Sequence, residues 1–245
     1  MTGPRVAALY DVHGNLPALE AVLVEVERQR VDLVVVGGDV AWGPMPAETL
    51  DRLRAFGDRA RFLRGNADRE VAGRVIGIDP EIDAVTLWCA DRLGPEQLAF
   101  LAALPERVSL DIVGLGPALF CHGSPRRDDE RITATTPEAR LAEMLAGVPE
   151  ETVVFGHTHA QFERVACGKR LVNPGSAGLP YGERGAYWAL LGPDVELLRT
   201  EYDVEAAAEA ALGSGQPSAE GVADVLLRPP TADEATAEWE AMRGP

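Results

Sequence analysis

Cysteine is scarce in this sequence of 245 residues. Only Cys89, Cys121 and Cys167 occur, and no two of them have the CxxC spacing. An odd number of scattered cysteines argues against a disulfide framework and against a cysteine-based zinc site. We therefore expect a reduced, intracellular setting in which all three side chains act as small buried hydrophobic groups.

Long apolar runs are missing as well. No stretch approaches the roughly 18 apolar residues that a membrane span requires. The first residues, MTGPRVAALYDVHG, contain no apolar segment that ends in a cleavage site. We expect a cytoplasmic protein without a membrane partner, and the length suits one large domain with a hydrophobic core.

Positive charge is in deficit, because 23 Lys and Arg residues face 39 Asp and Glu residues, for a net charge of -16. Such a surface repels long polyanions, which argues against long nucleic acid as a partner. Small phosphorylated substrates remain compatible with it, because bound metal cations can reverse the charge inside a site.

The order of segments is typical of an α/β protein. Short apolar runs closed by glycine alternate with stretches in which apolar residues recur every three or four positions. Strands are predicted at 6–9, 33–36, 60–63, 107–112, 118–121 and 152–155. Helices are predicted at 16–26, 47–55, 137–145 and within 68–104, where breaks occur near 77–80 and 94–95. Short antiparallel strands are predicted at 161–166, 170–172, 186–191 and 195–199.

The C-terminal part differs in composition. It is rich in Ala and Glu and is interrupted by GSGQPS and by an Arg-Pro-Pro sequence. Short helices are predicted at 204–211, 219–227 and 232–242. We predict a main domain of residues 1–202 and a helical C-terminal extension of residues 203–245 that packs on it.

All four histidines follow predicted strands. His13 lies in DVHG, His122 in CHG, and His157 and His159 in GHTH, and none lies on a predicted helix face. Two further pairs, Gly38-Asp39 and Gly65-Asn66, occupy the same kind of strand-to-helix corner. In open α/β sheets ligands bind at the carboxyl ends of strands.

These residue types point to a metal site. Imidazole with carboxylate suits zinc, iron, manganese or nickel, and the neighbouring glycines allow the backbone to turn sharply beside a ligand. DxH or GD alone is usually a turn or a helix cap. GHxH is more informative, since alternate residues of a strand point to opposite sides and only a bent backbone brings both histidines to one centre.

The order of these motifs resembles that of a known family. DxH, GD, GNxD, a histidine after a strand and GHTH follow one another as in the calcineurin-like metallophosphoesterases. The sequence Asn173-Pro174-Gly175-Ser176 is similar to the NPGS element of the small bacterial and archaeal, phosphodiesterase-type branch. The resemblance covers about residues 5–200. It implies a four-layer αββα sandwich, in which two mixed sheets are flanked by helices and the site lies at strand ends.

The resemblance also implies a complete ligand set for two divalent transition-metal ions per chain, which can be Mn, Fe, Zn or Ni. The first ion would be held by Asp11, His13, Asp39 and His159, and the second by the bridging Asp39 with Asn66, His122 and His157. A hydroxide between the ions would attack phosphorus. Asp39, Asn66 and His122 would be catalytic, and Asn66 and His122 would also touch the phosphate.

Two positions depart from the family pattern. Ala67 stands where many relatives have a histidine that protonates the leaving group, which shifts the expected substrate towards diesters or activated esters. Tyr10 precedes Asp11 where serine is common, and we expect altered hydrogen bonding near the first metal.

The residues that hold the substrate are less well defined by the sequence. Tyr181 and Arg184 follow the NPGS loop, and Ser124, Arg126 and Arg127 follow His122. Arginine makes bidentate pairs with phosphate, but loop arginines are also common as solvated surface residues. Trp42, close after Asp39, would stack on a base or simply pack.

The sequence favours a phosphodiesterase that acts on a small phosphorylated substrate. A dinucleoside polyphosphate hydrolase or a phosphomonoesterase on the same site is the main alternative. A mononuclear zinc hydrolase would not need the whole ordered ligand set, and a non-catalytic metal-binding scaffold would not need to keep it. Oligomeric state stays open.

Overall fold

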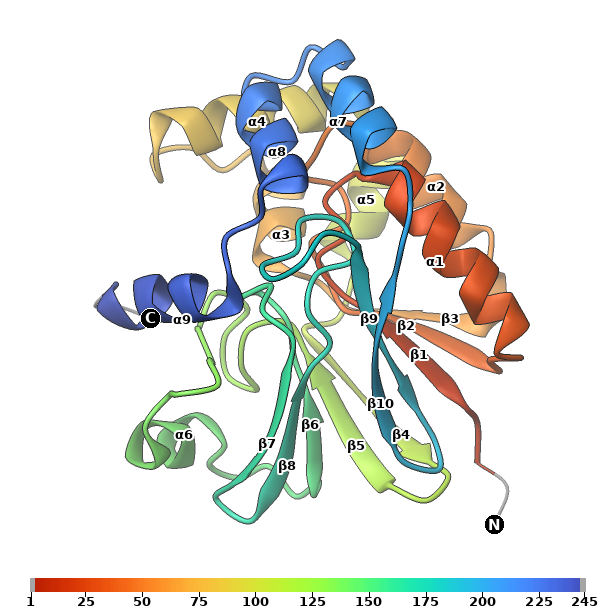
Figure 1. The fold of residues 1–245 in the computed structure, drawn as a ribbon, viewed down its shortest axis with the longest axis vertical. Coiled ribbons are helices and arrows are strands. Elements are labelled where there is room, and N and C mark those ends of the chain that lie inside the picture. The colour runs from red at the N-terminus through yellow and green to blue at the C-terminus, as the bar shows by residue number, and fades with distance from the viewer. Residues whose placement is uncertain (1–2, 243–245) are drawn as a thin grey trace.

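The computed structural model describes residues 3–242, whose strands form two mixed five-stranded sheets (Figure 1). The strand order is β10-β9-β1-β2-β3 in the first sheet and β4-β5-β6-β8-β7 in the second. The first sheet contains β1 (Val6–Leu9), β2 (Leu33–Val36), β3 (Ala60–Phe62), β9 (Ala186–Leu191) and β10 (Val195–Thr200). The second contains β4 (Arg107–Ile112), β5 (Gly116–Cys121), β6 (Thr152–Val154), β7 (Phe162–Ala166) and β8 (Lys169–Asn173).

Apolar residues cover both faces of each sheet. In β1, Ala7 and Leu9 join the core under the helices, whereas Ala8 joins the core between the sheets. In β5, Phe120 faces the inter-sheet core and Leu119 faces the outer side of the second sheet. Because side chains alternate along a strand, two-sided burial produces stacked layers. The predicted four-layer sandwich is confirmed.

The two outer helical layers are unequal. The core on the first sheet receives side chains from α1 (Leu16–Arg28), α2 (Pro46–Arg54), α3 (Asn66–Gly73), α4 (Pro80–Arg92) and α5 (Pro95–Ala102). An exposed 3₁₀ turn at Gly57–Arg59 precedes β3. The second sheet is covered by α6 (Glu138–Met144) and loops (Figure 1). Within residues 3–242, no helix is both long enough and apolar enough to span a bilayer.

The C-terminal helices pack on the rest of the chain. Helices α7 (Val204–Gly213) and α8 (Ala219–Leu227) share a small apolar core with Leu179 and Trp42, two residues that lie close to the strand-end loops. Helix α9 (Ala232–Ala241) is held separately, because the indole N–H of Trp239 donates to the carbonyl of Thr158 (3.2 Å). The tail therefore reaches the strand ends.

The predicted antiparallel strands after residue 161 are confirmed as two hairpins in different sheets. The β7–β8 hairpin joins the second sheet through a parallel β6–β8 pair, and the β9–β10 hairpin joins the first sheet beside β1. One expectation needs correction, because the three cysteines are not alike. Cys89 and Cys121 are buried, but Cys167 is exposed, since it occupies the β7–β8 turn with φ of 53°.

Candidate metal centre

The loops that carry the predicted ligands converge where the strands of both sheets end. Beyond β1 and β2 the backbones stay paired, and the N–H of Asp11 donates to the carbonyl of Gly38 (3.1 Å). Beyond β5 and β6, the N–H of Gly156 donates to the carbonyl of His122 (2.7 Å). Parallel strands bring their carboxyl ends to the same edge, so residues distant in the sequence meet here.

Six of the seven predicted ligands form two groups of three. In each group, one donor atom per residue lies within 4.8 Å of the others: Asp11, His13 and His159 in the first group, and Asp39, His122 and His157 in the second. His157 and His159 thus belong to different groups. The seventh residue, Asn66, opens helix α3 and lines a cavity that is also lined by His13 and His159 of the first group and by Asp39 and His157 of the second. That cavity has a volume of about 640 Å³.

Both carboxylates face donors of both groups. The Oδ2 atom of Asp39 lies 3.3 Å from Nε2 of His122 and 3.8 Å from Nε2 of His13. The Oδ1 atom of Asp11 lies 3.5 Å from Nε2 of His159 and 3.7 Å from Nε2 of His122. Negative charge is therefore available between the two groups, where two neighbouring cations would need it.

The orientation of the histidines calls for positive charge. Nδ1 of His13 lies 3.0 Å from the Trp42 carbonyl, and Nδ1 of His159 lies 2.7 Å from the Leu179 carbonyl. A carbonyl only accepts, so each Nδ1 must carry the proton. The two Nε2 atoms nevertheless face each other at 3.1 Å. Two lone pairs at this distance need a proton or a metal cation between them.

Several donor atoms are buried without a partner. Among the seven predicted ligands, the atoms without a partner in the described part of the chain are Asp11 Oδ1, Asn66 Oδ1, His122 Nε2 and His157 Nε2. A buried polar atom without a hydrogen bond costs about 1–3 kcal/mol, so four of them in one place require an explanation. Nitrogen and oxygen donors of this kind suit a divalent transition metal. The residues present therefore fit a pair of cations.

The local charges shift the two histidines of the second group in opposite directions. Burial lowers the pKa of His122, but the carboxylates of Asp39 and Asp11 outweigh burial and raise this pKa to about 10. Burial and the neighbouring His122 lower the pKa of His157 to about 4. The field of the site thus favours one positive charge at His122 and a neutral, ligating imidazole at His157.

Five of the predicted ligands have a strained backbone. Positive φ angles occur at Asp11 (53°), His13 (46°), Asp39 (53°), His157 (67°) and His159 (57°). Left-handed conformations are uncommon outside glycine, although Asp and His tolerate them better than most residues. Such strain is typical of functional sites. It supplies the bent backbone that the GHTH motif requires.

The NPGS loop holds the first group in place. The hydroxyl of Ser176 donates to the carbonyl of Asp11 (2.7 Å) and accepts from the backbone N–H of Leu179 (2.7 Å). Leu179 in turn orients His159. The Asn173 amide donates to the carbonyl of Gly156 (3.2 Å). The role of this loop is therefore to position ligands.

Asp68 holds the second group in place, a role that the sequence does not reveal. Its buried carboxylate accepts from the backbone N–H groups of Val40 (2.9 Å), Ala41 (3.2 Å) and Gly65 (3.2 Å). It thereby ties the loop of Asp39 to the loop that precedes Asn66. At Gly65 a Cβ atom would lie 2.0 Å from Oδ1 of Asp39, so glycine is needed for this close approach.

Tyr10 lies in the core between the sheets rather than beside the metal ligands. Its ring is fully buried, and its hydroxyl donates to the carbonyl of Val154 (3.1 Å). A Cβ atom on Gly37 would lie 2.1 Å from this ring. Tyr10 thus links the two sheets, and its hydroxyl does not bind Asp11, contrary to the expectation from its place before the first ligand.

Only some of the residues predicted to contact the substrate line the cavity. Tyr181 lines the cavity, and its ring centroid lies 5.0 Å from that of His159. Arg184 is not among the described residues that line it, because its guanidinium donates to the Leu227 carbonyl (2.7 Å) and to Glu205 (2.8 Å). Trp42 lines the cavity and packs edge-on against His13.

The three candidates that follow His122 are engaged with their own loop. The hydroxyl of Ser124 and the Nε of Arg126 donate to Glu130 (2.5 and 2.8 Å). Arg127 pairs with Asp129 (2.9 Å). Their hydrogen bonds therefore go to neighbouring carboxylates.

Sequence reasoning missed the residues that complete the cavity. Arg131 comes from the same loop, Trp239 comes from α9, and Ile78 and Ile82 come from the segment around the start of α4. Trp239 carried a signal, since it is a single large aromatic residue in a helix of small and acidic residues, ADEATAEWEA. Arg131 has no feature in the sequence that separates it from Arg126.

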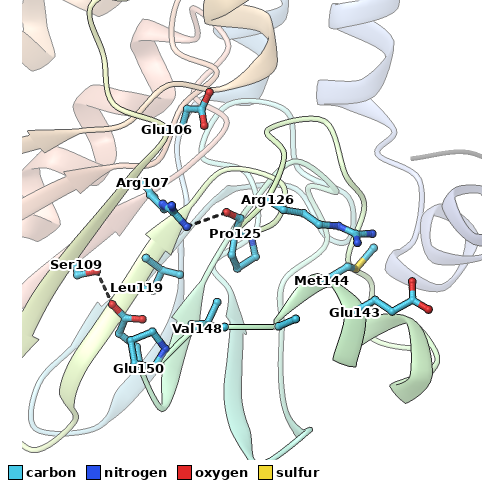
Figure 2. Close-up of a pocket in the computed structure, with 13 residues that line it drawn as sticks. Glu106, Arg107, Ser109, Leu119, Pro125, Arg126, Glu143, Met144, Val148 and Glu150 are labelled. Atoms are coloured by element: carbon cyan, nitrogen blue, oxygen red, sulfur yellow. Dashed lines mark hydrogen bonds between the residues drawn. The ribbon is translucent and has the colours of Figure 1, made fainter.

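A second cavity of about 570 Å³ lies between α6 and the strands β4 and β5 (Figure 2). Several of its polar side chains have partners in the protein. Arg107 donates to the carbonyl of Pro125 (3.3 Å), and Ser109 donates to Glu150 (2.6 Å), as the dashed lines show. Arg126 also lines this cavity.

The comparisons with known proteins agree with this geometry. A sequence model of the calcineurin-like phosphoesterase superfamily domain matches residues 5–194. An uncharacterised protein of Methanocaldococcus jannaschii is 26% identical over 233 residues, which cover 85% of this chain and 92% of that protein. A hypothetical protein of Pyrococcus horikoshii has a similar structure, with a TM-score of 0.81 and 23% identity over 93% of this chain and 99% of the other. A metallophosphoesterase of Sphaerobacter thermophilus has a TM-score of 0.75 and 28% identity, over 92% and 99% of the two chains.

Proposed function

This chain belongs to the calcineurin-like phosphoesterase superfamily, and from that premise we propose that it hydrolyses phosphodiesters with two divalent cations. The observation that carries the proposal is the set of buried donor atoms of Asp11, Asn66, His122 and His157 that have no partner within the described residues. Asn66 and His157 line the cavity, and Asp11 and His122 lie in the ligand groups whose other members line it. A protein that used this surface only as a scaffold would not need to keep such a costly arrangement.

The donor geometry supports two ions rather than one. Asp39 and Asp11 each face histidines of both groups. The first ion would be held by Asp11, His13, Asp39 and His159, and the second by Asp39, Asn66, His122 and His157. When bound, the cations supply charge that polarises phosphoryl oxygens and acidifies water to give the nucleophile.

The chain's own residues orient the reaction. The carbonyls of Trp42 and Leu179 hold the rings of His13 and His159 with Nε2 turned inward. Asn66 is the first residue of helix α3, and the partial positive charge of the helix N-terminus favours a phosphate group there. Fixed donors that need no rearrangement lower the cost of charge development in the transition state.

The diester preference rests on Ala67. This residue lines the cavity next to Asn66 and offers no side-chain proton donor, while its backbone N–H donates to Asp39 (2.9 Å). The leaving oxygen must then depart without a histidine acid, which favours diesters and activated esters.

The test uses protein stripped of metal and reloaded with Mn²⁺, assayed with bis(p-nitrophenyl) phosphate beside p-nitrophenyl phosphate. We expect two ions per chain by elemental analysis, Mn²⁺-dependent turnover, and faster diester than monoester cleavage. Asp39→Asn is the matched control, because it keeps the size of the side chain and removes the shared charge.

Other results of the same experiment would favour one of the alternative functions. One ion per chain would indicate a mononuclear hydrolase, and faster monoester cleavage would indicate a phosphomonoesterase. Two ions without turnover of either ester, with Zn²⁺, Ni²⁺ and Fe²⁺ as well, would indicate a scaffold or an enzyme restricted to a substrate such as a dinucleoside polyphosphate.

A further inference from the structure

The cavity that residues of both ligand groups line has an apolar side. It is formed by Val75 and Ile78, which lie between α3 and α4, and by Ile82 in the first turn of α4. Ile78 is 51% exposed and Ile82 is 38% exposed. Apolar side chains exposed together on the wall of a polar cavity are characteristic of a ligand-binding surface. This side of the cavity therefore suits an apolar part of a ligand.

Arg131 lies on the same cavity and differs from the other arginines of its loop. Arg126 donates to Glu130 and Arg127 donates to Asp129. The Nε atom of Arg131 is buried and has no hydrogen-bond partner among the residues that the structure describes. A guanidinium has five N–H donors in a rigid fork, and because Nε is closed to solvent, the terminal Nη groups of Arg131 are the donors that would meet an anion in the cavity.

Trp239 fixes the position of this guanidinium. The guanidinium carbon of Arg131 lies 4.9 Å from the centroid of the Trp239 ring, and the centroid of the same ring lies 5.8 Å from that of His157. The indole N–H is bound to the Thr158 carbonyl. The next residue, Glu240, accepts from Thr133 (2.6 Å) and anchors α9. One aromatic ring thus lies close to both the Arg131 cation and a residue of the second ligand group.

The other arginine on the cavity is already paired. Arg69 donates to both carboxylate oxygens of Asp128, at 2.8 and 3.1 Å. The same guanidinium also donates to Glu70 (3.5 Å), so two carboxylates compensate its charge. Of the two arginines that line the cavity in residues 3–242, Arg69 is thus paired with carboxylates and Arg131 is not.

We propose that Arg131, stacked on Trp239, and the side chains of Ile78 and Ile82 form a subsite for the non-reacting part of the substrate. This subsite takes an apolar or aromatic group and, beyond it, a second anionic group. The substrate class is therefore a phosphate ester whose organic group is apolar and carries a further negative charge. This inference rests on the proposed function.

The test measures the binding of three phosphonates that differ by one feature at a time: methylphosphonate, phenylphosphonate and p-carboxyphenylphosphonate. Calorimetry on the Mn²⁺-loaded protein gives affinities, and competition with bis(p-nitrophenyl) phosphate gives inhibition constants. We expect phenylphosphonate to bind at least about tenfold tighter than methylphosphonate, because it buries a ring. We expect the added carboxylate to contribute a further gain of about tenfold through Arg131.

Variants separate the two parts of the subsite. Arg131→Gln should abolish the gain from the carboxylate and keep the gain from the ring, and Arg131→Lys should restore part of the lost gain. Ile78→Ser with Ile82→Ser should reduce the gain from the ring. Arg126→Gln is the matched control, because Arg126 lies in the same loop and faces the second cavity. It should leave all three affinities unchanged.

Equal affinities of the wild-type protein for the three phosphonates would overturn the proposal, as would an Arg131→Gln variant that keeps the full gain from the carboxylate. Trp239→Phe should retain the gain, and Trp239→Ala should lose it while Mn²⁺ stays bound. Failure of the proposed function is distinguishable, because it would appear as wild-type protein that neither binds two ions nor hydrolyses the diester.

Discussion

The two cavities described above have similar volumes, about 640 and 570 Å³, but they differ in how their polar groups are satisfied. In the cavity between α6 and the strands β4 and β5, Arg107 and Ser109 donate hydrogen bonds to protein acceptors (Figure 2). At the strand ends, Arg131 on the cavity wall, and Asp11 and His122 in the adjoining ligand groups, keep buried polar atoms that have no partner within the described residues.

This difference is more informative than size. A folding protein gains by pairing its buried polar groups, and an unpaired group costs about 1–3 kcal/mol. Donors that stay unpaired therefore indicate an external partner, whereas a cavity with satisfied walls needs none. Variants in the two cavities should thus differ in their effect on metal binding and hydrolysis.

The largest expected effect comes from His122→Ala. The Nε2 atom of His122 faces Asp39 and Asp11 at 3.3 and 3.7 Å, so its loss removes a donor of the second group. We expect one ion per chain instead of two, and diester hydrolysis reduced by at least about a hundredfold. Elemental analysis and initial rates measure both. Two bound ions with wild-type hydrolysis would show that His122 is not a ligand.

The next largest effect is expected from Asp68→Ala, which changes no ligand. It leaves the buried N–H groups of Val40, Ala41 and Gly65 without their acceptor. Because residues that position ligands typically change metal affinity by about 10–100-fold, we expect a loss in this range for the second ion. A titration with Mn²⁺ should show the loss, and excess Mn²⁺ should restore hydrolysis. If excess metal gives no recovery, Asp68 does more than position the loops.

A smaller effect is expected from Ser176→Ala in the NPGS loop. The backbone N–H of Leu179 loses its acceptor, but the carbonyl of Asp11 keeps the hydrogen bond from Gly178 (3.0 Å). We expect about tenfold weaker binding of the first ion and an unchanged maximal rate at saturating metal. The comparison of the rate at limiting and saturating Mn²⁺ tests this. A lower maximal rate at saturation would place Ser176 closer to the chemistry.

The sequence predicts which residues form the two ligand groups better than it predicts the other residues of the cavity, for physical reasons. Motifs such as DVHG and GHTH combine ligand side chains with glycines at strand ends, so chemistry and backbone geometry leave one local signature. The assignment of the β7–β8 and β9–β10 hairpins to different sheets depends on long-range pairing, which leaves no local signature.

The substrate side of the cavity shows the same limit. Arg126, Arg131 and Arg184 are alike as loop arginines, and only their partners distinguish them: Glu130 for Arg126, Glu205 for Arg184, and the ring of Trp239 for Arg131. Glu205 and Trp239 are remote in the sequence from the arginines that they contact. Glu130 is near Arg126 in the sequence, but whether the two pair depends on the orientation of their side chains. A prediction of substrate contacts from the sequence therefore selects residues by type and misses α9, whose contribution depends on where the tail packs.

The smallest effect is expected from Arg107→Gln in the second cavity. Its guanidinium donates to a backbone carbonyl, that of Pro125, at 3.3 Å, and the carbonyl of a loop can accept from water instead. Because surface substitutions of this kind usually change stability by less than about 0.5 kcal/mol, rates and metal affinities should stay within about twofold of wild type. Mn²⁺ titration and diester hydrolysis measure both quantities beside Arg131→Gln. If Arg107→Gln lost as much hydrolysis as His122→Ala, the second cavity would be coupled to the two ligand groups. The presence or absence of hydrogen-bond partners would then not distinguish a binding cavity from a structural one.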